Sequence, residues 1–253
     1  MKNVFAFAAM LFATMSCSSD SDKSEPLKPI NDVTINYGQE WFVNEIGDKS
    51  VSFENDFIAS FKDGKLNGDH VGQTIAKTSD ERKFNVTVKS TVNQIKDLEI
   101  DWEKDADWYW KNNPFGTMKD NGNYYKTTYA YQDPITQIVY GYTFSPERKL
   151  IGAAILVPIS YASQLGTYLK ERCMPVSTES ISDEIFAAGF NAYDYKKATM
   201  LFAVSLPNLT AYQVTIINPK DVNSATTRSQ INNISPAIRD IFAKEFLGKR
   251  AQR

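Results

Sequence analysis

Cysteine and histidine are scarce in this chain, which has two cysteines and one histidine among 253 residues. One histidine, His70, and one free thiol cannot supply the ligands of a typical zinc site. No nucleophile motif such as G-x-S-x-G accompanies His70, so we assign no catalytic residue. If Cys17 carries a lipid, Cys173 has no partner within the chain, which excludes a disulfide framework. Cys173 is then expected to be a small buried hydrophobic residue at a helix end rather than a nucleophile.

Nucleotide-binding motifs, an excess of positive charge and a membrane-spanning apolar run are also lacking. The chain has no P-loop and no G-x-G-x-x-G, so no cofactor is predicted. With 28 Lys and Arg against 30 Asp and Glu it is close to neutral, and no nucleic-acid partner is predicted. The acidic run DWEKDAD fails as an EF-hand loop because Ala106 and Asn112 stand where Gly and Glu are required, so no metal site is predicted. The apolar stretch from Val4 to Met15 is too short to cross a bilayer as a helix.

The N-terminus carries the features of an export signal. Lys2 precedes the apolar stretch, and Cys17 stands between the end of that stretch and the polar run SSDSD. These residues resemble a bacterial lipoprotein signal, and SCSSDSD resembles lipoproteins of the Bacteroides group. The resemblance implies cleavage before Cys17 and a diacylglyceride on its sulfur, which labelled palmitate would reveal. The protein is then expected in the outer membrane, facing the periplasm or the cell surface. The alternative is an ordinary cleaved signal with a chance cysteine.

The rest of the chain divides by composition and pattern. The sequence predicts a signal peptide (1–16), a lipidated flexible tether (17–30), a β-sandwich (31–92), an α+β domain (97–219), and a polar linker with a C-terminal helix (220–253). Apolar alternation stops near Ser90 and helical signals begin near Asp101. We therefore expect limited proteolysis to cut around 90–100 and to give a small all-β fragment and a larger α+β fragment.

Residues 31–91 contain short strands separated by glycine turns. Phe84, Val86 and Val88 alternate with polar residues, which predicts a half-buried strand. The order NDFIASF, DGK, LNG, VGQTI and KFNVTVK resembles the bacterial Ig-like group 2 domain, with one residue fewer than usual between Gly72 and Ile75. The resemblance implies an Ig-like β-sandwich that acts as a spacer or an adhesive module on a cell surface.

Residues 97–219 predict two αβββ units on one antiparallel sheet. Asp101 is the expected N-cap of the first helix and Ser160 that of the second. The segments YTFSPERKLIGAAILVP and FAVSLPNLTAYQVTIINP have similar patterns, which indicates a weak internal repeat. Buried strand positions are expected at Ile138, Tyr140, Tyr142 and Phe144. The C-terminal helix, which Ser235 would cap, is expected to dock on this domain.

One aromatic cluster is the only candidate binding site. Trp102, Trp108, Tyr109 and Trp110 lie close together, followed by Phe115. Exposed rings of this kind bind sugars or peptides, whereas buried rings would fill the interface between helix and sheet. Positions 108 and 110 are about 200° apart around a helix. We expect Trp110 to point inward and Trp108 to form a ligand platform.

The function predicted from these features is binding or adhesion, with a glycan, a peptide or another envelope protein as partner and the membrane reached through Cys17. Nothing in the sequence favours an enzyme. The first alternative is a hydrolase, which would show two or three carboxylates converging in a pocket of the second domain. The second is a purely structural envelope component, which would show an apolar patch and no pocket.

Overall fold

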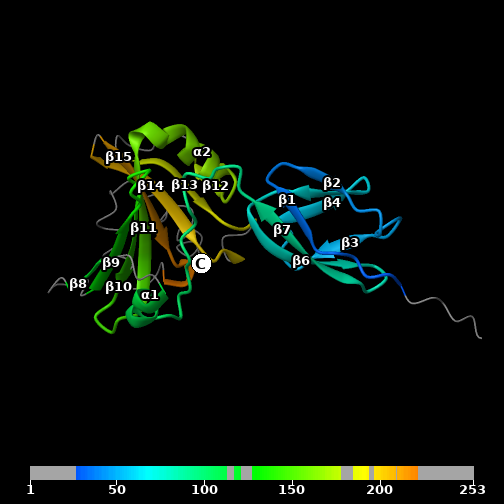
Figure 1. Cartoon of the computed structure of the whole chain (residues 1–253), viewed down its shortest axis with the longest axis horizontal. Helices are drawn as coiled ribbons and strands as arrows, with labels where there is room; N and C mark the ends of the chain where they lie inside the picture. The colour runs from blue at the N-terminus through cyan, green and yellow to red at the C-terminus, as the bar shows by residue number, and fades with distance from the viewer. Residues whose placement is uncertain are drawn as a thin grey trace, which may run out of the picture.

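The computed structural model describes residues 27–112, 117–120, 127–177, 185–193, 197–208 and 210–221. The predicted signal peptide, Cys17 and the predicted C-terminal helix lie outside these residues. Within the described part of the chain, no helix is both long and apolar enough to cross a membrane. The described residues form an N-terminal lobe (27–89) and a C-terminal lobe (92–221), which lie end to end in Figure 1.

The N-terminal lobe consists of short strands in two sheets. The strands are β1 (Val33–Asn36), β2 (Glu40–Phe42), β3 (Val51–Phe53), β4 (Ala59–Lys62), β5 (Lys65–Gly68), β6 (Gly72–Thr78) and β7 (Lys83–Lys89). One sheet has the order β1-β7-β6-β3 and the other has the order β2-β5-β4. β1 pairs with β7 in parallel, and the other pairs are antiparallel. The lobe is therefore all-β, as predicted.

One hydrophobic core lies between the two sheets of this lobe. Phe84, Val86 and Val88 are buried on β7, which confirms the predicted alternation. They share a cluster with Leu66 of the second sheet. Gly72 begins β6 with a φ of 153°, and a Cβ there would lie 2.7 Å from the Ile58 side chain, so a larger residue would collide with the core.

The C-terminal lobe has two helices and one eight-stranded sheet among its described residues. Its elements are α1 (Ala106–Asn112), β8 (Thr117–Asp120), β9 (Thr127–Gln132), β10 (Val139–Phe144), β11 (Leu150–Pro158), the 3-10 turn η1 (Ile159–Tyr161), α2 (Ala162–Lys170), β12 (Met174–Ser177), β13 (Ile185–Phe190), β14 (Leu201–Asn208), β15 (Ala211–Ile217) and the 3-10 turn η3 (Pro219–Asp221). The sheet order is β12-β13-β14-β15-β11-β10-β9-β8, and all pairs are antiparallel. Each helix thus precedes four strands rather than three, which corrects the predicted αβββ repeat to αββββ.

The two strands that the sequence pattern missed are β8 and β12, and they form the two edges of the sheet. Each has only four residues. Edge strands need no apolar alternation, and they tolerate proline and charge because one side of their backbone has no partner strand. The last strands of the two units, β11 and β15, pair in the middle of the sheet, so the two units meet there.

Both helices begin later than predicted. The N-cap of α1 is Asp105, whose Oδ1 accepts a hydrogen bond from the Trp108 backbone N–H at 2.9 Å. Asp101 instead accepts a hydrogen bond within the preceding turn. Ser160 does not cap α2, because η1 intervenes and the N-cap position falls on Tyr161, which makes no side-chain capping bond.

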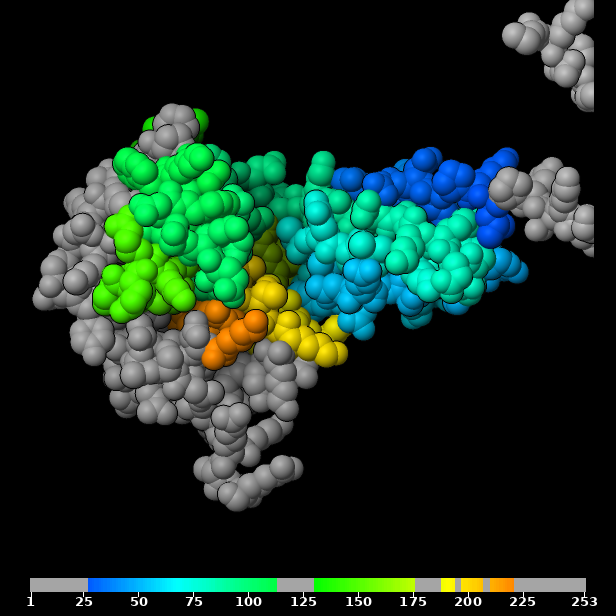
Figure 2. Space-filling view, turned by 90° about the horizontal axis from the view of Figure 1, so that it is seen from below, coloured from blue at the N-terminus to red at the C-terminus, as the bar shows by residue number. Residues whose placement is uncertain are grey.

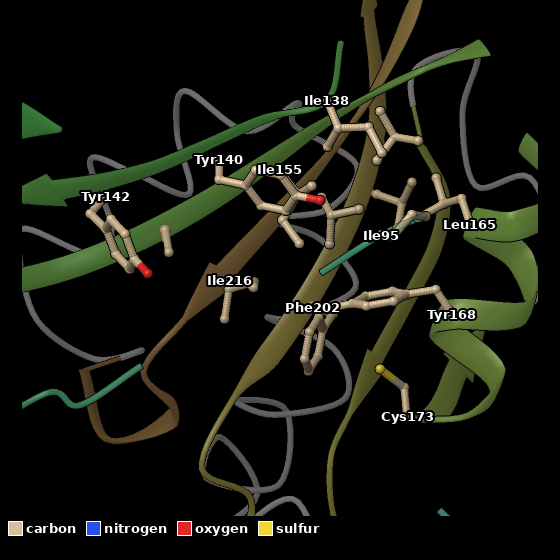
Figure 3. Packing of buried hydrophobic residues seen from close by; sticks show 14 of the residues in the cluster. Ile95, Ile138, Tyr140, Tyr142, Ile155, Leu165, Tyr168, Cys173, Phe202 and Ile216 are labelled. Carbon is tan, nitrogen blue, oxygen red and sulfur yellow. The ribbon is translucent and has the colours of Figure 1, made fainter. Parts of the chain in front are cut away.

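The core of the C-terminal lobe lies between the sheet and the helices α1 and α2. Figure 3 shows the part of this core beside α2. Tyr140, Tyr142 and Phe144 are buried on β10, as predicted. Leu165 of α2 contributes to the same cluster. Cys173 is buried beside it, which confirms the expected packing role, and burial raises the pKa of its thiol.

The segment between the lobes is partly buried, and the expected proteolytic cleavage at 90–100 stays a prediction. Val92 and Ile95 are buried in the core of the C-terminal lobe. The backbone N–H of Lys96 donates to the Tyr140 hydroxyl at 2.9 Å. Val92 and Ile95 thus connect the end of the N-terminal lobe directly to the core of the C-terminal lobe.

Candidate functional site

Tyr109 belongs to the core and is not available to a ligand. Its side chain is fully buried, and its ring lies 4.4 Å from that of Tyr142 and 5.5 Å from that of Phe144, between centroids. The hydroxyl accepts from the backbone N–H of Asp101 at 2.8 Å and donates to its carbonyl at 3.1 Å. Burial raises the pKa of Tyr109 to about 12. This residue therefore anchors α1 to the sheet.

The three tryptophans of the predicted cluster occupy different environments. Trp108 is half-buried, with its ring 5.0 Å from that of Tyr109. Trp110 is 45% exposed. Trp102 is half-buried, and its indole N–H donates to the Thr199 carbonyl at 2.9 Å. Phe115 lies outside the described residues.

The expectation that Trp110 points inward and Trp108 outward is therefore wrong. The buried residues of α1 are Ala106 and Tyr109, which are separated by three positions. Trp110 lies about 100° beyond Tyr109 around the helix, which turns it away from the sheet. The sequence placed the buried face one residue too late, because a helix of two turns offers few positions from which to infer its direction.

A better-defined site lies where the two lobes meet, and it centres on Glu171. This side chain has no exposed surface. It accepts hydrogen bonds from the Ser90 hydroxyl at 2.5 Å, from the Thr91 backbone N–H at 2.9 Å and from the Thr91 hydroxyl. Its backbone carbonyl accepts from the N–H of Val71, in the N-terminal lobe, at 2.8 Å. Glu171 therefore ties the end of α2 to both the first lobe and the connecting segment.

Arg172 continues this network toward the surface. Its Nε and Nη2 donate to the two carboxylate oxygens of Asp97 at 2.5 and 2.9 Å. Its Nη1 donates to Glu171 and to the Tyr168 carbonyl, each at 3.2 Å. The guanidinium also lies over the Tyr168 ring, with Cζ 3.9 Å from the centroid. One guanidinium is thus shared between two carboxylates.

The pKa values of Glu171 and Arg172 both shift so that the charged form is favoured. Burial alone would raise the pKa of Glu171, but the hydrogen bonds from Ser90 and Thr91 and the charge of Arg172 outweigh it and hold that pKa below its ordinary value. Burial alone would lower the pKa of Arg172, but Asp97 and Glu171 hold it above its ordinary value. Both shifts favour the charged form, so Glu171 and Arg172 are ionised at neutral pH.

Aromatic rings extend the contact between the lobes. The His70 ring stacks on Phe57 at 3.6 Å between centroids, and His70 Nδ1 lies 2.8 Å from the Phe57 carbonyl oxygen. Phe57 meets the edge of Tyr193, from the C-terminal lobe, at 5.5 Å. Figure 2 shows yellow atoms of the C-terminal lobe lying against the N-terminal lobe. Burial lowers the pKa of His70, which favours a neutral ring that packs in the junction.

A cavity of about 200 Å³ opens beside this network. Its lining comes from both lobes: Val71, Gly72, Asp97, Leu98, Tyr168, Arg172, Asn191, Met200, Phe202 and Ile216. Most of these side chains are apolar, and the charged ones are Asp97 and Arg172. Pockets for drug-sized ligands usually measure about 300–1,000 Å³. This cavity therefore suits one amino-acid side chain or one small group.

The arrangement does not match the site expected of a hydrolase. Asp97 is the one carboxylate among the described residues that line the cavity. Glu171 is shielded from solvent and already accepts several hydrogen bonds, so it has no free proton-transfer role. The described residues also contain no group of three or more potential metal ligands.

The sequence offered little sign of this junction. Glu171 and Arg172 precede Cys173 in the segment LKERCMPV, and adjacent opposite charges at a helix end usually indicate a solvated surface. The one available signal was their position directly before a cysteine that was itself expected to be buried.

Comparison of the chain with protein-family models, with curated proteins and with solved structures found no match.

Proposed function

We propose that this protein is an outer-membrane lipoprotein, anchored through Cys17, that binds a ligand at the junction of its two lobes. The N-terminal lobe acts as an Ig-like spacer, and the partner is a glycan, a peptide or another envelope protein. The layout in Figure 1 supports this role, because the N-terminal lobe separates the start of the described chain from the C-terminal lobe. A tether attached there would hold the junction away from the membrane surface.

The strand order supports the Ig-like assignment. With the strands lettered A to G along the chain, β2, β5 and β4 form the sheet B-E-D, and β3, β6 and β7 form C-F-G. Immunoglobulin sandwiches divide strands B to G in this way. Strand A, which is β1, here lies beside G rather than beside B. The sequence resemblance over residues 31–91 points to the same family.

The observation that carries the binding role is the cavity beside the buried Glu171 and Arg172, whose network joins the lobes. Glu171 and Arg172 are both almost fully buried, and their partners come from the connecting segment. Such a junction holds the cavity walls from the two lobes in one fixed arrangement, because moving them apart would expose or unpair buried charges. A purely structural component was expected to have no pocket, and the cavity favours binding instead.

The anchor is tested by replacing Cys17. The variant Cys17→Ser is expected to leave the membrane fraction and to incorporate no labelled palmitate, whereas the matched control Cys173→Ser remains membrane-bound and labelled. Membrane retention of Cys17→Ser, together with no label in the wild-type protein, would show that no lipid anchor exists.

The binding role is tested with peptide and glycan arrays probed with the full chain carrying Cys17→Ser. Leu98→Phe places a larger side chain in the cavity and is expected to abolish binding of any array ligand. The control Ile135→Ala changes a hairpin residue that is 88% exposed and is expected to leave binding unchanged. If the arrays yield no ligand that Leu98→Phe weakens, the junction is not a binding site.

A further inference from the structure

The junction network carries one unit of surplus negative charge. Asp97 and Glu171 are two carboxylates, and Arg172 is the one cation that bonds to both of them. The Asp97 side chain is 54% exposed, whereas Glu171 has no exposed surface. The surplus charge is therefore accessible at Asp97, on the wall of the cavity.

The hydrogen-bonding capacity at this wall favours a donor ligand. Each Asp97 oxygen accepts one bond from Arg172, and a carboxylate has about four acceptor positions in total, so Asp97 can accept more. The guanidinium has five N–H groups, and four of them already donate to Asp97, Glu171 and the Tyr168 carbonyl. An anionic ligand would thus meet a carboxylate and a cation with almost no donors left.

The remaining walls favour an aliphatic stem next to that donor. Leu98, Met200, Phe202 and Ile216 line the cavity with apolar surface. A wholly apolar ligand would fill this space but would take water away from Asp97 without replacing its hydrogen bonds. A wholly polar ligand would give up its hydration and would find no hydrogen-bond partners on the apolar walls.

We propose that the junction cavity binds an aliphatic primary ammonium group, with the alkyl stem against the apolar walls and the charged nitrogen on Asp97. This inference rests on the proposed function and names the ligand chemistry of the same site. The side chain of a lysine within a peptide and a free alkylamine share this chemistry. A cavity of about 200 Å³ has room for either.

The experiment compares three probes on the full chain carrying Cys17→Ser, by isothermal titration calorimetry. The probes are N-acetyl-lysine methylamide, its uncharged analogue N-acetyl-norleucine methylamide, and n-butylamine. The lysine probe is expected to bind about tenfold or more tightly than the norleucine probe, which is the usual effect of a hydrogen bond to a charged group. Tighter binding of the lysine probe than of butylamine identifies a peptide source, and the reverse identifies a free amine; both support the proposal. Equal affinity for the lysine and norleucine probes overturns it.

Two variants locate the binding. Asp97→Asn is expected to lower the affinity for the lysine probe about tenfold. Glu99→Gln removes the same charge from an exposed position outside the cavity and is expected to leave that affinity unchanged. Leu98→Phe is expected to abolish binding while leaving the Asp97–Arg172 pair intact, so the site remains testable if Asp97→Asn weakens the junction.

These outcomes separate the two proposals. An array ligand that Leu98→Phe weakens but Asp97→Asn does not would overturn the ammonium inference and leave the binding role standing. The absence of any ligand sensitive to Leu98→Phe would overturn the binding role itself.

Discussion

Replacing Glu171 with alanine tests whether the junction holds the two lobes together. The substitution removes the acceptor of four hydrogen bonds, three from Ser90 and Thr91 and one from Arg172. Arg172 keeps its two bonds to Asp97, so the cost comes mainly from the Ser90 and Thr91 donors, which lose their buried acceptor. Each buried donor left unsatisfied costs about 1–3 kcal/mol, and costs within one network do not simply add, so we expect a loss of about 3–5 kcal/mol in total. Since domains are stable by about 5–15 kcal/mol, Glu171→Ala is expected to remove a large share of the stability.

The assay is urea denaturation, followed by tryptophan fluorescence and far-ultraviolet circular dichroism. Three of the four tryptophans, Trp102, Trp108 and Trp110, lie in the C-terminal lobe, and Trp41 lies in the other. Fluorescence therefore reports mainly the C-terminal lobe, whereas circular dichroism reports both. In the wild type the two signals are expected to change together. In Glu171→Ala they are expected to separate, because the lobes lose their shared buried contacts.

Two control variants sharpen this experiment. Glu171→Gln keeps the shape and one acceptor oxygen but removes the charge, so its expected cost is about 1.5–3 kcal/mol. Glu99→Ala removes an exposed carboxylate in the same part of the chain, and its free energy of unfolding is expected to stay within about 0.5 kcal/mol of the wild-type value.

The effect of Glu171 is also expected to depend on pH. The folded pKa of this group lies below its ordinary value of 4.5. Its contribution to the free energy of unfolding is therefore fully present above the ordinary pKa and is lost as pH falls through the folded pKa. The difference in the free energy of unfolding between the wild type and Glu171→Gln is therefore expected to decrease below about pH 4. A loss under about 0.5 kcal/mol in Glu171→Ala, or an unchanged difference down to about pH 3, would refute the role assigned to this residue.

Two further predictions concern the C-terminal lobe. Tyr109→Ala is expected to lower the free energy of unfolding by about 3–5 kcal/mol, because it leaves a cavity at a buried site. Trp110→Ala is expected to change it by less than about 1 kcal/mol, because that side chain is 45% exposed. Urea denaturation measures both, and equal losses would contradict the orientation of α1. Cys173 is expected to resist iodoacetamide in the native protein and to react in denaturant, since its buried thiol has a raised pKa; mass spectrometry measures the adduct, and rapid native labelling would contradict its burial.

Local patterns in the sequence were sufficient for the buried faces of the longer elements. Alternation correctly identified Phe84, Val86 and Val88 in β7, because successive side chains of a strand point to opposite faces whatever the rest of the chain does. Tyr140, Tyr142 and Phe144 of β10 were likewise found from alternation. Such patterns repeat within one element, so the sequence of that element contains the whole signal.

Only the tertiary structure decided the direction of α1, the edge strands β8 and β12, and the junction. Tyr109 faces inward because the sheet lies on that side of α1. The two turns of this helix do not contain enough apolar positions to determine which side faces the sheet. Glu171 meets Ser90 and Thr91 across about 80 positions of sequence. No local pattern distinguishes such a buried charge from a solvated one, because the donors that make its burial tolerable are brought to it only when the chain folds.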